Sequence, residues 1–100
     1  MITINGKLLK KLDVTAGISK ANRDWRQQLF IIEQDNAFKD ELCCSLFNDK
    51  ISLLEPYNEG DWIVLTVKLR SREYNGKFYH DIIVVHIESL IEDTNEDQIF

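Results

Sequence analysis

The feature that most constrains the fold of this chain is the pair Asn75-Gly76, which lies between two long alternating segments. An Asn-Gly pair in this setting is the strongest short-range indication of a β-hairpin, because both residues accept the positive φ angles of a tight turn. We therefore expect antiparallel strands at residues 62–74 and 77–89. A chain of 100 residues suits one domain with a single core, so this hairpin must be a large part of it.

The rest of the sequence predicts three more strands. Residues 2–12 alternate in part, residues 25–34 are rich in aromatic and β-branched side chains, and residues 42–47 form a short apolar run. Residues 15–24 have no hydrophobic periodicity and contain glycine, serine and asparagine, so they are predicted to be a loop.

A short helix is predicted between the third and fourth strands. Asn48 is a candidate N-cap, Asp49 is an acid in the first turn, and Ile51 and Leu54 are at helical spacing. Pro56 disfavours helical backbone in the residue before it, so the helix should be about two turns long.

The predicted order is strand-strand-strand-helix-strand-strand, which is the order of the OB-fold, an all-β five-stranded barrel with its helix between strands three and four. An SH3-like barrel would lack the helix, and a ferredoxin-like domain would need a helix where residues 15–24 have no apolar stripe. We expect residues 1–90 to form the OB-fold domain and residues 91–100 to form an acidic tail without fixed structure.

The formal net charge of −5 is unevenly distributed. Residues 92–100 contain four acidic and no basic side chains, so the remaining 91 residues carry a formal charge of −1. Within that body, residues 7–26 carry +4 and residues 62–80 carry +3. A nearly neutral body with two basic segments can bind a polyanion although the whole chain is acidic.

These basic segments coincide with the predicted loops that join strands one–two and four–five, which flank the ligand-binding face of an OB-fold. On the fourth strand, Ile63, Leu65, Val67 and Leu69 are expected to face the core, and the opposite face is cationic. Single-stranded nucleic acid needs cations for its phosphates and rings that stack on its bases. The candidates for phosphate contacts are Lys20, Arg23, Arg26, Lys68, Arg70, Arg72 and Lys77, and those for base stacking are Trp25, Phe47, Tyr74, Phe78 and Tyr79.

Several aromatic rings also have a structural interpretation. Phe78 and Tyr79 are successive strand residues on opposite faces, so at least one of them is expected to be structural. Phe47 ends the third strand and could face either way. Phe30 is assigned to the core, and Trp62 is expected to pack against the barrel or the helix.

No motif predicts an enzyme, a metal site or a cofactor. His80 and His86 are six residues apart on one strand, about 20 Å, too far to share a metal. The adjacent Cys43 and Cys44 would point to opposite faces of a strand, which makes a mutual disulfide poor. No apolar run is long enough to span a membrane and no signal peptide is recognised, so we expect a cytoplasmic protein.

Three strings carry a family resemblance: Trp25-Arg26, "SLFNDK" at 45–50 and "SREYNGKFY" at 71–79. They resemble a family of short bacterial and phage OB-fold proteins related to single-stranded-DNA-binding protein, over roughly residues 2–88. The resemblance implies a homo-oligomer that binds single-stranded DNA with little sequence preference and protects it in replication, recombination or repair. A protein-interaction OB module and an RNA-binding OB protein are the alternatives.

The last residues are similar to the C-terminal tip of bacterial single-stranded-DNA-binding proteins, an acidic run closed by Pro-Phe. Here Gln98-Ile99 stands where Ile-Pro would be. The resemblance implies that Asp97, Ile99 and Phe100 recruit replication or repair proteins.

Overall fold

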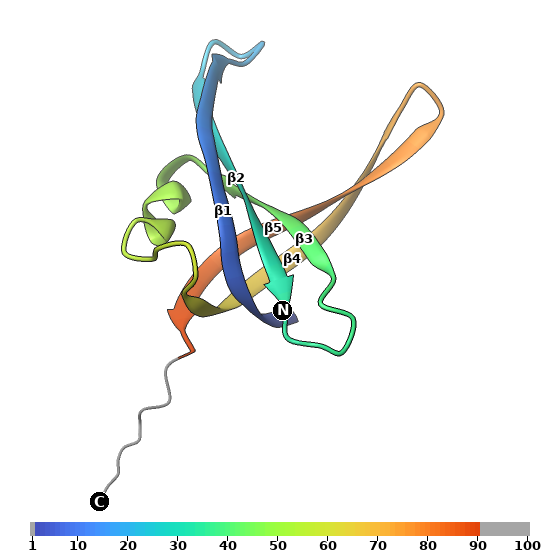
Figure 1. Ribbon diagram of the computed structural model, residues 1–100. Helices are drawn as coiled ribbons and strands as arrows, with labels where there is room; N and C mark the ends of the chain where they lie inside the picture. The colour runs from blue at the N-terminus through green and yellow to red at the C-terminus, as the bar shows by residue number, and fades with distance from the viewer. Residues whose placement is uncertain (1, 91–100) are drawn as a thin grey trace, which may run out of the picture.

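The computed structural model describes residues 2–90, which form a closed five-stranded barrel with one 3-10 helix (Figure 1). The strands follow one another around the barrel in the order β1-β2-β3-β5-β4. The element order confirms the predicted OB-fold, whereas the predicted tail lies outside the described residues. The elements are β1 (Ile2–Ile18), β2 (Asp24–Gln34), β3 (Glu41–Phe47), η1 (Asn48–Leu54), β4 (Trp62–Tyr74) and β5 (Lys77–Ser89).

The barrel closes because β1 is long enough to pair with two neighbours. Residues 2–7 pair with β4 and residues 6–18 pair with β2, both antiparallel, so Gly6 has partners on both strands. A Cβ atom at Gly6 would lie 2.9 Å from the carbonyl oxygen of Glu33, so only glycine fits at this crossing. On the other side, β3 and β5 meet through the parallel pair Ser45 and Ile83.

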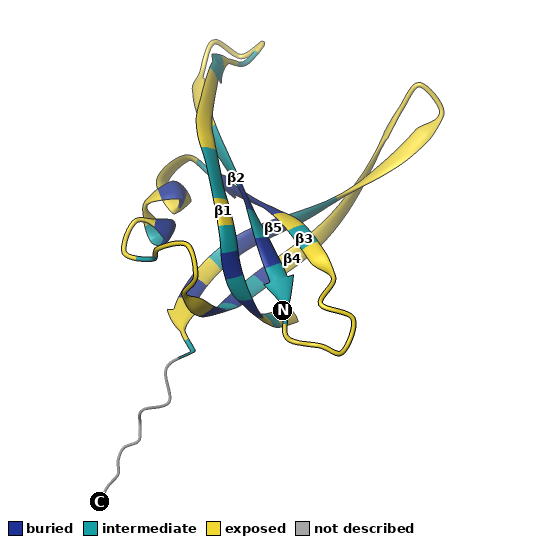
Figure 2. Ribbon diagram, viewed as in Figure 1, coloured by how far each residue is buried: buried dark blue, intermediate teal, exposed yellow. Residues whose placement is uncertain are grey.

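The core is apolar and is built from the inward positions of all five strands (Figure 2). Phe30 and Ile32 of β2 are fully buried, as their alternation predicted, and Ile51 and Leu54 of η1 cover the core from one side. Leu69 was predicted to continue the core face of β4 but is 61 % exposed. The reason is that β4 leaves the barrel after Val67, so the inward face of the strand has no core to meet.

Beyond the barrel, two pairs of strands continue as two-stranded ribbons that diverge from each other (Figure 1). We call them the β1–β2 arm (residues 14–28) and the β4–β5 arm (residues 68–82). Half of the predicted loop at 15–24 is strand, because β1 pairs with β2 as far as Ile18 and Asp24, and residues 19–23 form the connection. Nearly all its residues are exposed, so no hydrophobic alternation marked the segment as a strand.

The helix lies where it was predicted, but its N-cap differs from the prediction. It is a 3-10 helix, and its N-cap position is Phe47, with no capping hydrogen bond from a side chain. Asn48 instead adopts a φ of 52° and accepts a hydrogen bond from the backbone N–H of Arg26 at its Oδ1 (3.0 Å). Glu55 keeps a helical backbone before Pro56, contrary to the expectation.

The β4–β5 hairpin has the predicted turn, with φ of 53° at Asn75 and 78° at Gly76. One irregularity interrupts its ladder: Thr66 pairs with His86 and Val67 with Val84, which leaves Val85 as a bulge. His80 and His86 therefore lie on opposite faces of β5, although their spacing suggested one face.

Cys43 is exposed and Cys44 is buried, as expected for neighbours on a strand. Burial, together with the nearby Cys43, raises the pKa of the Cys44 thiol to about 12. Within residues 2–90 no group of histidine, cysteine and acidic side chains could hold a metal ion. No helix in this part of the chain is long and apolar enough to cross a membrane.

Candidate nucleic-acid interface

One row of paired residues connects the outward side of β2 and β3 with the β4–β5 arm. Leu29 pairs with Ser45, Ser45 with Ile83, and Ile83 with Lys68. Paired residues project from the same face of a sheet, and Phe30, next to Leu29, points into the core. The face that carries this row therefore points away from the core, and we call it the outer face. Ser45 and Ile83, in the middle of the row, are themselves buried, so the exposed surface of this face lies to either side of them.

On the β4–β5 arm, the outer face carries most of the predicted hairpin contacts. Alternation from Lys68 places Arg70, Arg72 and Tyr74 on it, as the sequence predicted. The antiparallel register adds their partners from β5 to the same face, and these include one acid. The partners are Lys77, Tyr79 and Asp81.

On β2 and β3, the outer face holds Trp25 and Phe47. Phe47 pairs with Gln27, two residues from Trp25, so the two residues occupy diagonal positions on this face. The Trp25 ring lies over Gly17 of β1, where a Cβ atom would come within 2.6 Å of its Cζ2. Glycine at this position is what allows the ring to lie against the backbone of the β1–β2 arm.

The outer face also includes residues that the sequence interpretation did not select. Leu29 and Ile31 are half-buried, Cys43 is exposed, and Lys10 is exposed opposite Ile31. Once Phe30 and Ile32 are assigned to the core, alternation alone sends Leu29 and Ile31 outward. That signal was present in the sequence.

Four predicted contacts lie elsewhere. Arg26 and Phe78 alternate with Trp25 and Tyr79 and therefore lie on the opposite faces of their arms. Lys20 and Arg23 belong to the tip of the β1–β2 arm, where Ser19 accepts a hydrogen bond from the N–H of Arg23 (3.3 Å).

The expectation that Phe78 or Tyr79 is structural is wrong, because both rings are exposed, at 68 % and 42 %. They sit on a ribbon that extends past the barrel, where neither face is covered. Trp62, which was expected to pack against the barrel or the helix, is also exposed, at 38 %, and the Lys7 Nζ lies 6.0 Å from the centroid of its ring.

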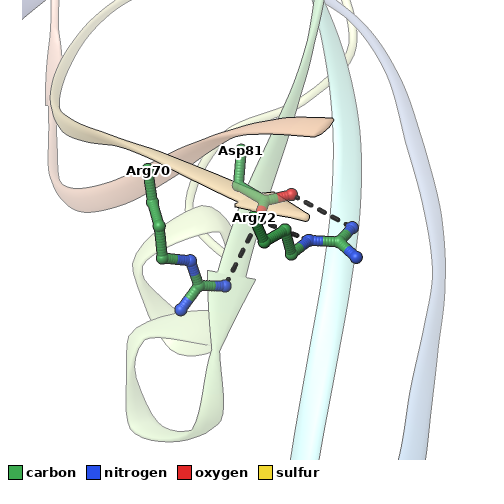
Figure 3. A network of polar contacts seen from close by, with 3 residues as sticks. All are labelled: Arg70, Arg72 and Asp81. Carbon is green, nitrogen blue, oxygen red and sulfur yellow. Dashed lines mark hydrogen bonds and ion pairs between the residues drawn. The ribbon is translucent and has the colours of Figure 1, made fainter. Parts of the chain in front are cut away.

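Asp81 holds the two arginines of the arm (Figure 3). Arg72 donates from Nε to its Oδ2 (2.9 Å) and from an Nη to its Oδ1 (3.4 Å), and Arg70 donates from an Nη to its Oδ2 (3.3 Å). The hydrogen bond from Arg72 is the largest cause that lowers the pKa of the Asp81 carboxyl, so it is ionised at neutral pH. The guanidinium of Arg72 also lies 5.5 Å from the centroid of the Tyr79 ring.

The sequence could have revealed this contact. A two-residue turn at Asn75-Gly76 sets the register, which places Asp81 opposite Arg70. The basic segment at 62–80 ends one residue before this acid, which lowers the formal charge of the hairpin by one.

Solved structures similar to this chain share the fold at low sequence identity. The second OB-fold domain of replication protein A from Methanococcus maripaludis has a TM-score of 0.65 and 15% identity, covering 93% of this chain and 86% of that one. Rim1, a mitochondrial single-stranded DNA binding protein from S. cerevisiae, has a TM-score of 0.68 and 16% identity, covering 89% and 92%. The N-terminal domain of PriB from Thermoanaerobacter tencongensis, a dimeric structure, has a TM-score of 0.53 and 19% identity, covering 89% and 93%. These similarities show the OB-fold.

A search of curated proteins finds no match to this chain. A protein family does match it, over residues 3–88, almost the whole barrel with both arms. The chain therefore belongs to the family described as "Domain of unknown function (DUF3127)".

Proposed function

We propose that this protein binds single-stranded DNA with little sequence preference and protects it in replication, recombination or repair. The observation that supports this most is the continuous outer face, which joins Trp25 and Phe47 to the rings and cations of the β4–β5 arm. An OB-fold binds its ligands across strands two and three, between the two hairpins that here form the arms. The proposed function requires no catalytic group, and we propose that the protein is not an enzyme.

The side chains of this face suit a strand with unpaired bases. Tyr74 is 65 % exposed and Trp25 is 37 % exposed, so each presents ring surface on which a base can stack. Lys68 and Lys77 have no ion pair among the described residues and lie on the same face as Tyr74. Stacking rings and phosphate-binding cations do not distinguish bases, which is why the proposed binding is largely independent of sequence.

A salt titration with oligo-dT tests the proposal. Each phosphate that the protein neutralises contributes about −0.7 to the slope of log affinity against log salt, so affinity should fall steeply as salt rises. An oligo-dT of about 16 nucleotides, the upper end of the site size of one OB-fold, is a suitable probe. With Trp62→Phe, the fluorescence of Trp25 alone reports binding, and quenching is expected. Absence of binding at about 50 mM salt would refute the proposal.

A protein-interaction module is the second candidate function. Exposed apolar side chains occur on the arm faces opposite the outer face, namely Val14 and Ile18 on one arm and Leu69 and Phe78 on the other. Exposed apolar side chains of this kind can contact a partner protein. A partner retained after nuclease treatment, without any binding of oligo-dT, would favour this function.

RNA binding is the third candidate function. Competition between oligo-dT and oligo-U of the same length distinguishes it from binding of single-stranded DNA.

We further propose that Asp97, Ile99 and Phe100 recruit replication or repair proteins, on the likeness of the C-terminal sequence to a known tip. Deleting residues 92–100 removes four acidic side chains. The affinity for oligo-dT should then be unchanged or higher, because these charges repel phosphate. A marked loss of affinity in the deletion variant would show that the segment takes part in DNA binding instead.

We also propose an oligomeric state and a cellular location for this protein. The family resemblance supports a homo-oligomer, which light scattering of the purified chain would test. The proposed location is the cytoplasm, because an exposed free thiol such as that of Cys43 is typical of a reducing compartment, and fractionation of the source cells would test this.

A further inference from the structure

We propose that Asp81 limits the affinity of the β4–β5 arm for single-stranded DNA by occupying Arg70 and Arg72, so that a backbone phosphate must displace its carboxylate. The inference rests on the proposed function, because the competition requires a phosphate ligand. In this proposal Asp81 competes with phosphate for Arg70 and Arg72, which the sequence analysis named as candidate phosphate contacts.

The geometry of the contact supports competition. Arg72 uses both Nε and an Nη on the carboxylate of Asp81, at 2.9 and 3.4 Å, and Arg70 adds a bond of 3.3 Å. A guanidinium binds a phosphate through the same pairs of N–H groups that it offers a carboxylate. The donors that would bind a phosphate are therefore already engaged in the free protein.

The contact is also open enough to be exchanged. The side chains of Arg70 and Arg72 are 53 % and 58 % exposed, so a phosphate can approach either of them, while the side chain of Asp81 is only 16 % exposed. Exposed ion pairs are weak, because water screens the charges and both side chains lose freedom in forming them. Asp81 thus lowers the affinity of the arm without blocking it.

Asp81 is the acid of the outer face of this arm. The other acid of the β4–β5 arm, Glu73, pairs with Phe78 and so lies on the opposite face, away from the arginines. The chain thereby offers a matched control, since both acids lie on the same ribbon and differ in whether they contact Arg70 and Arg72.

The test compares Asp81→Asn with Glu73→Gln, each of which removes one negative charge and keeps the shape of the side chain. We expect Asp81→Asn to bind oligo-dT about three- to tenfold more tightly at about 50 mM salt, because Arg70 and Arg72 no longer give up an ion pair when they meet a phosphate. Glu73→Gln should change the affinity by no more than about twofold, through net charge alone.

A double-mutant cycle separates competition from a general charge effect. Arg72→Gln should cost more affinity in the Asp81→Asn background than in the wild-type protein, because only there is the arginine free for phosphate before binding. Equal losses in the two backgrounds would overturn the inference.

The opposite role for Asp81, holding the arginines in place for DNA, has the opposite sign. Weaker binding by Asp81→Asn, or a gain no larger than that of Glu73→Gln, overturns the inference while wild-type binding leaves the proposed function standing. If neither the wild-type protein nor Asp81→Asn binds oligo-dT, both fail. Circular dichroism of each variant verifies that the barrel is folded.

Discussion

Replacing Trp25 and Tyr74 together by alanine is expected to weaken binding of oligo-dT by about 30-fold or more. Stacking of one base on one aromatic ring contributes about 1–3 kcal/mol, so the loss of two rings removes at least about 2 kcal/mol. The two residues lie at separate places on the outer face, one on β2 and one at the tip of the β4–β5 arm. Their effects should add, because each ring stacks on a different base.

The salt slope provides a second measurement on the same variant. Removing rings leaves every cation in place, so the slope should be unchanged while the affinity falls. A variant with a weaker slope would indicate that the arms had lost their structure and not only their stacking surfaces.

The chain supplies a control on the same ribbon. Phe78 is about as exposed as Tyr74, at 68 % and 65 %, but it lies on the opposite face of the β4–β5 arm. We expect Phe78→Ala to change the affinity for oligo-dT by less than about twofold, since its ring would not meet a strand on the outer face. If Phe78→Ala weakened binding as much as Tyr74→Ala, the DNA would have to contact both faces, and the outer face would be the wrong site.

Replacing Phe30 by alanine is expected to lower the free energy of unfolding by about 3–5 kcal/mol. Phe30 is fully buried at the centre of β2, in a core that is built from one set of apolar side chains. The loss combines the transfer free energy of the ring with the cost of the cavity that it leaves. Because the free energy of unfolding of a small domain is only about 5–15 kcal/mol, this one substitution removes a large part of its stability.

Urea denaturation followed by circular dichroism measures this loss. Phe38→Ala is the matched control, because Phe38 is 85 % exposed in the connection between β2 and β3 and should change stability by no more than about 0.5 kcal/mol. A loss below about 1 kcal/mol for Phe30→Ala would mean that β2 does not contribute its inward face to the core as described.

Much of the barrel could be predicted from local chemistry. Asn75-Gly76 determines its own turn, since both residues take positive φ, and it sets the register of β4 and β5. Phe30 and Ile32 were assigned to the core from alternation alone, and both are fully buried. In such segments one face meets the core, so the side-chain pattern carries the information.

Where a segment leaves the core, the same pattern misleads. Residues 15–18 and 24 of the β1–β2 arm were predicted to be loop, and Leu69 was predicted to be buried, and both predictions are wrong for the same physical reason. A ribbon without a covered face is held by its backbone hydrogen bonds, which any residue except proline can form, so its sequence shows no periodicity. The end of the core along a strand is set by the neighbouring strands and cannot be found from that strand.

For the candidate site, too, some properties could be predicted from the sequence and others only from the structure. The residue types, rings and cations near the two hairpins, were evident in the sequence, as was the partition of charge between residues 92–100 and the rest. The tertiary structure decided which of them share a surface, because the pairing of Ser45 with Ile83 joins β3 to β5 across a long stretch of chain. The register that the Asn75-Gly76 turn sets already places Asp81 opposite Arg70, whereas only the structure shows that Arg72, two residues further along, bonds to the same carboxylate. The sequence by itself thus determined the barrel fold and the aromatic and basic side chains available for binding. The closure of the barrel determined which of these side chains share one face.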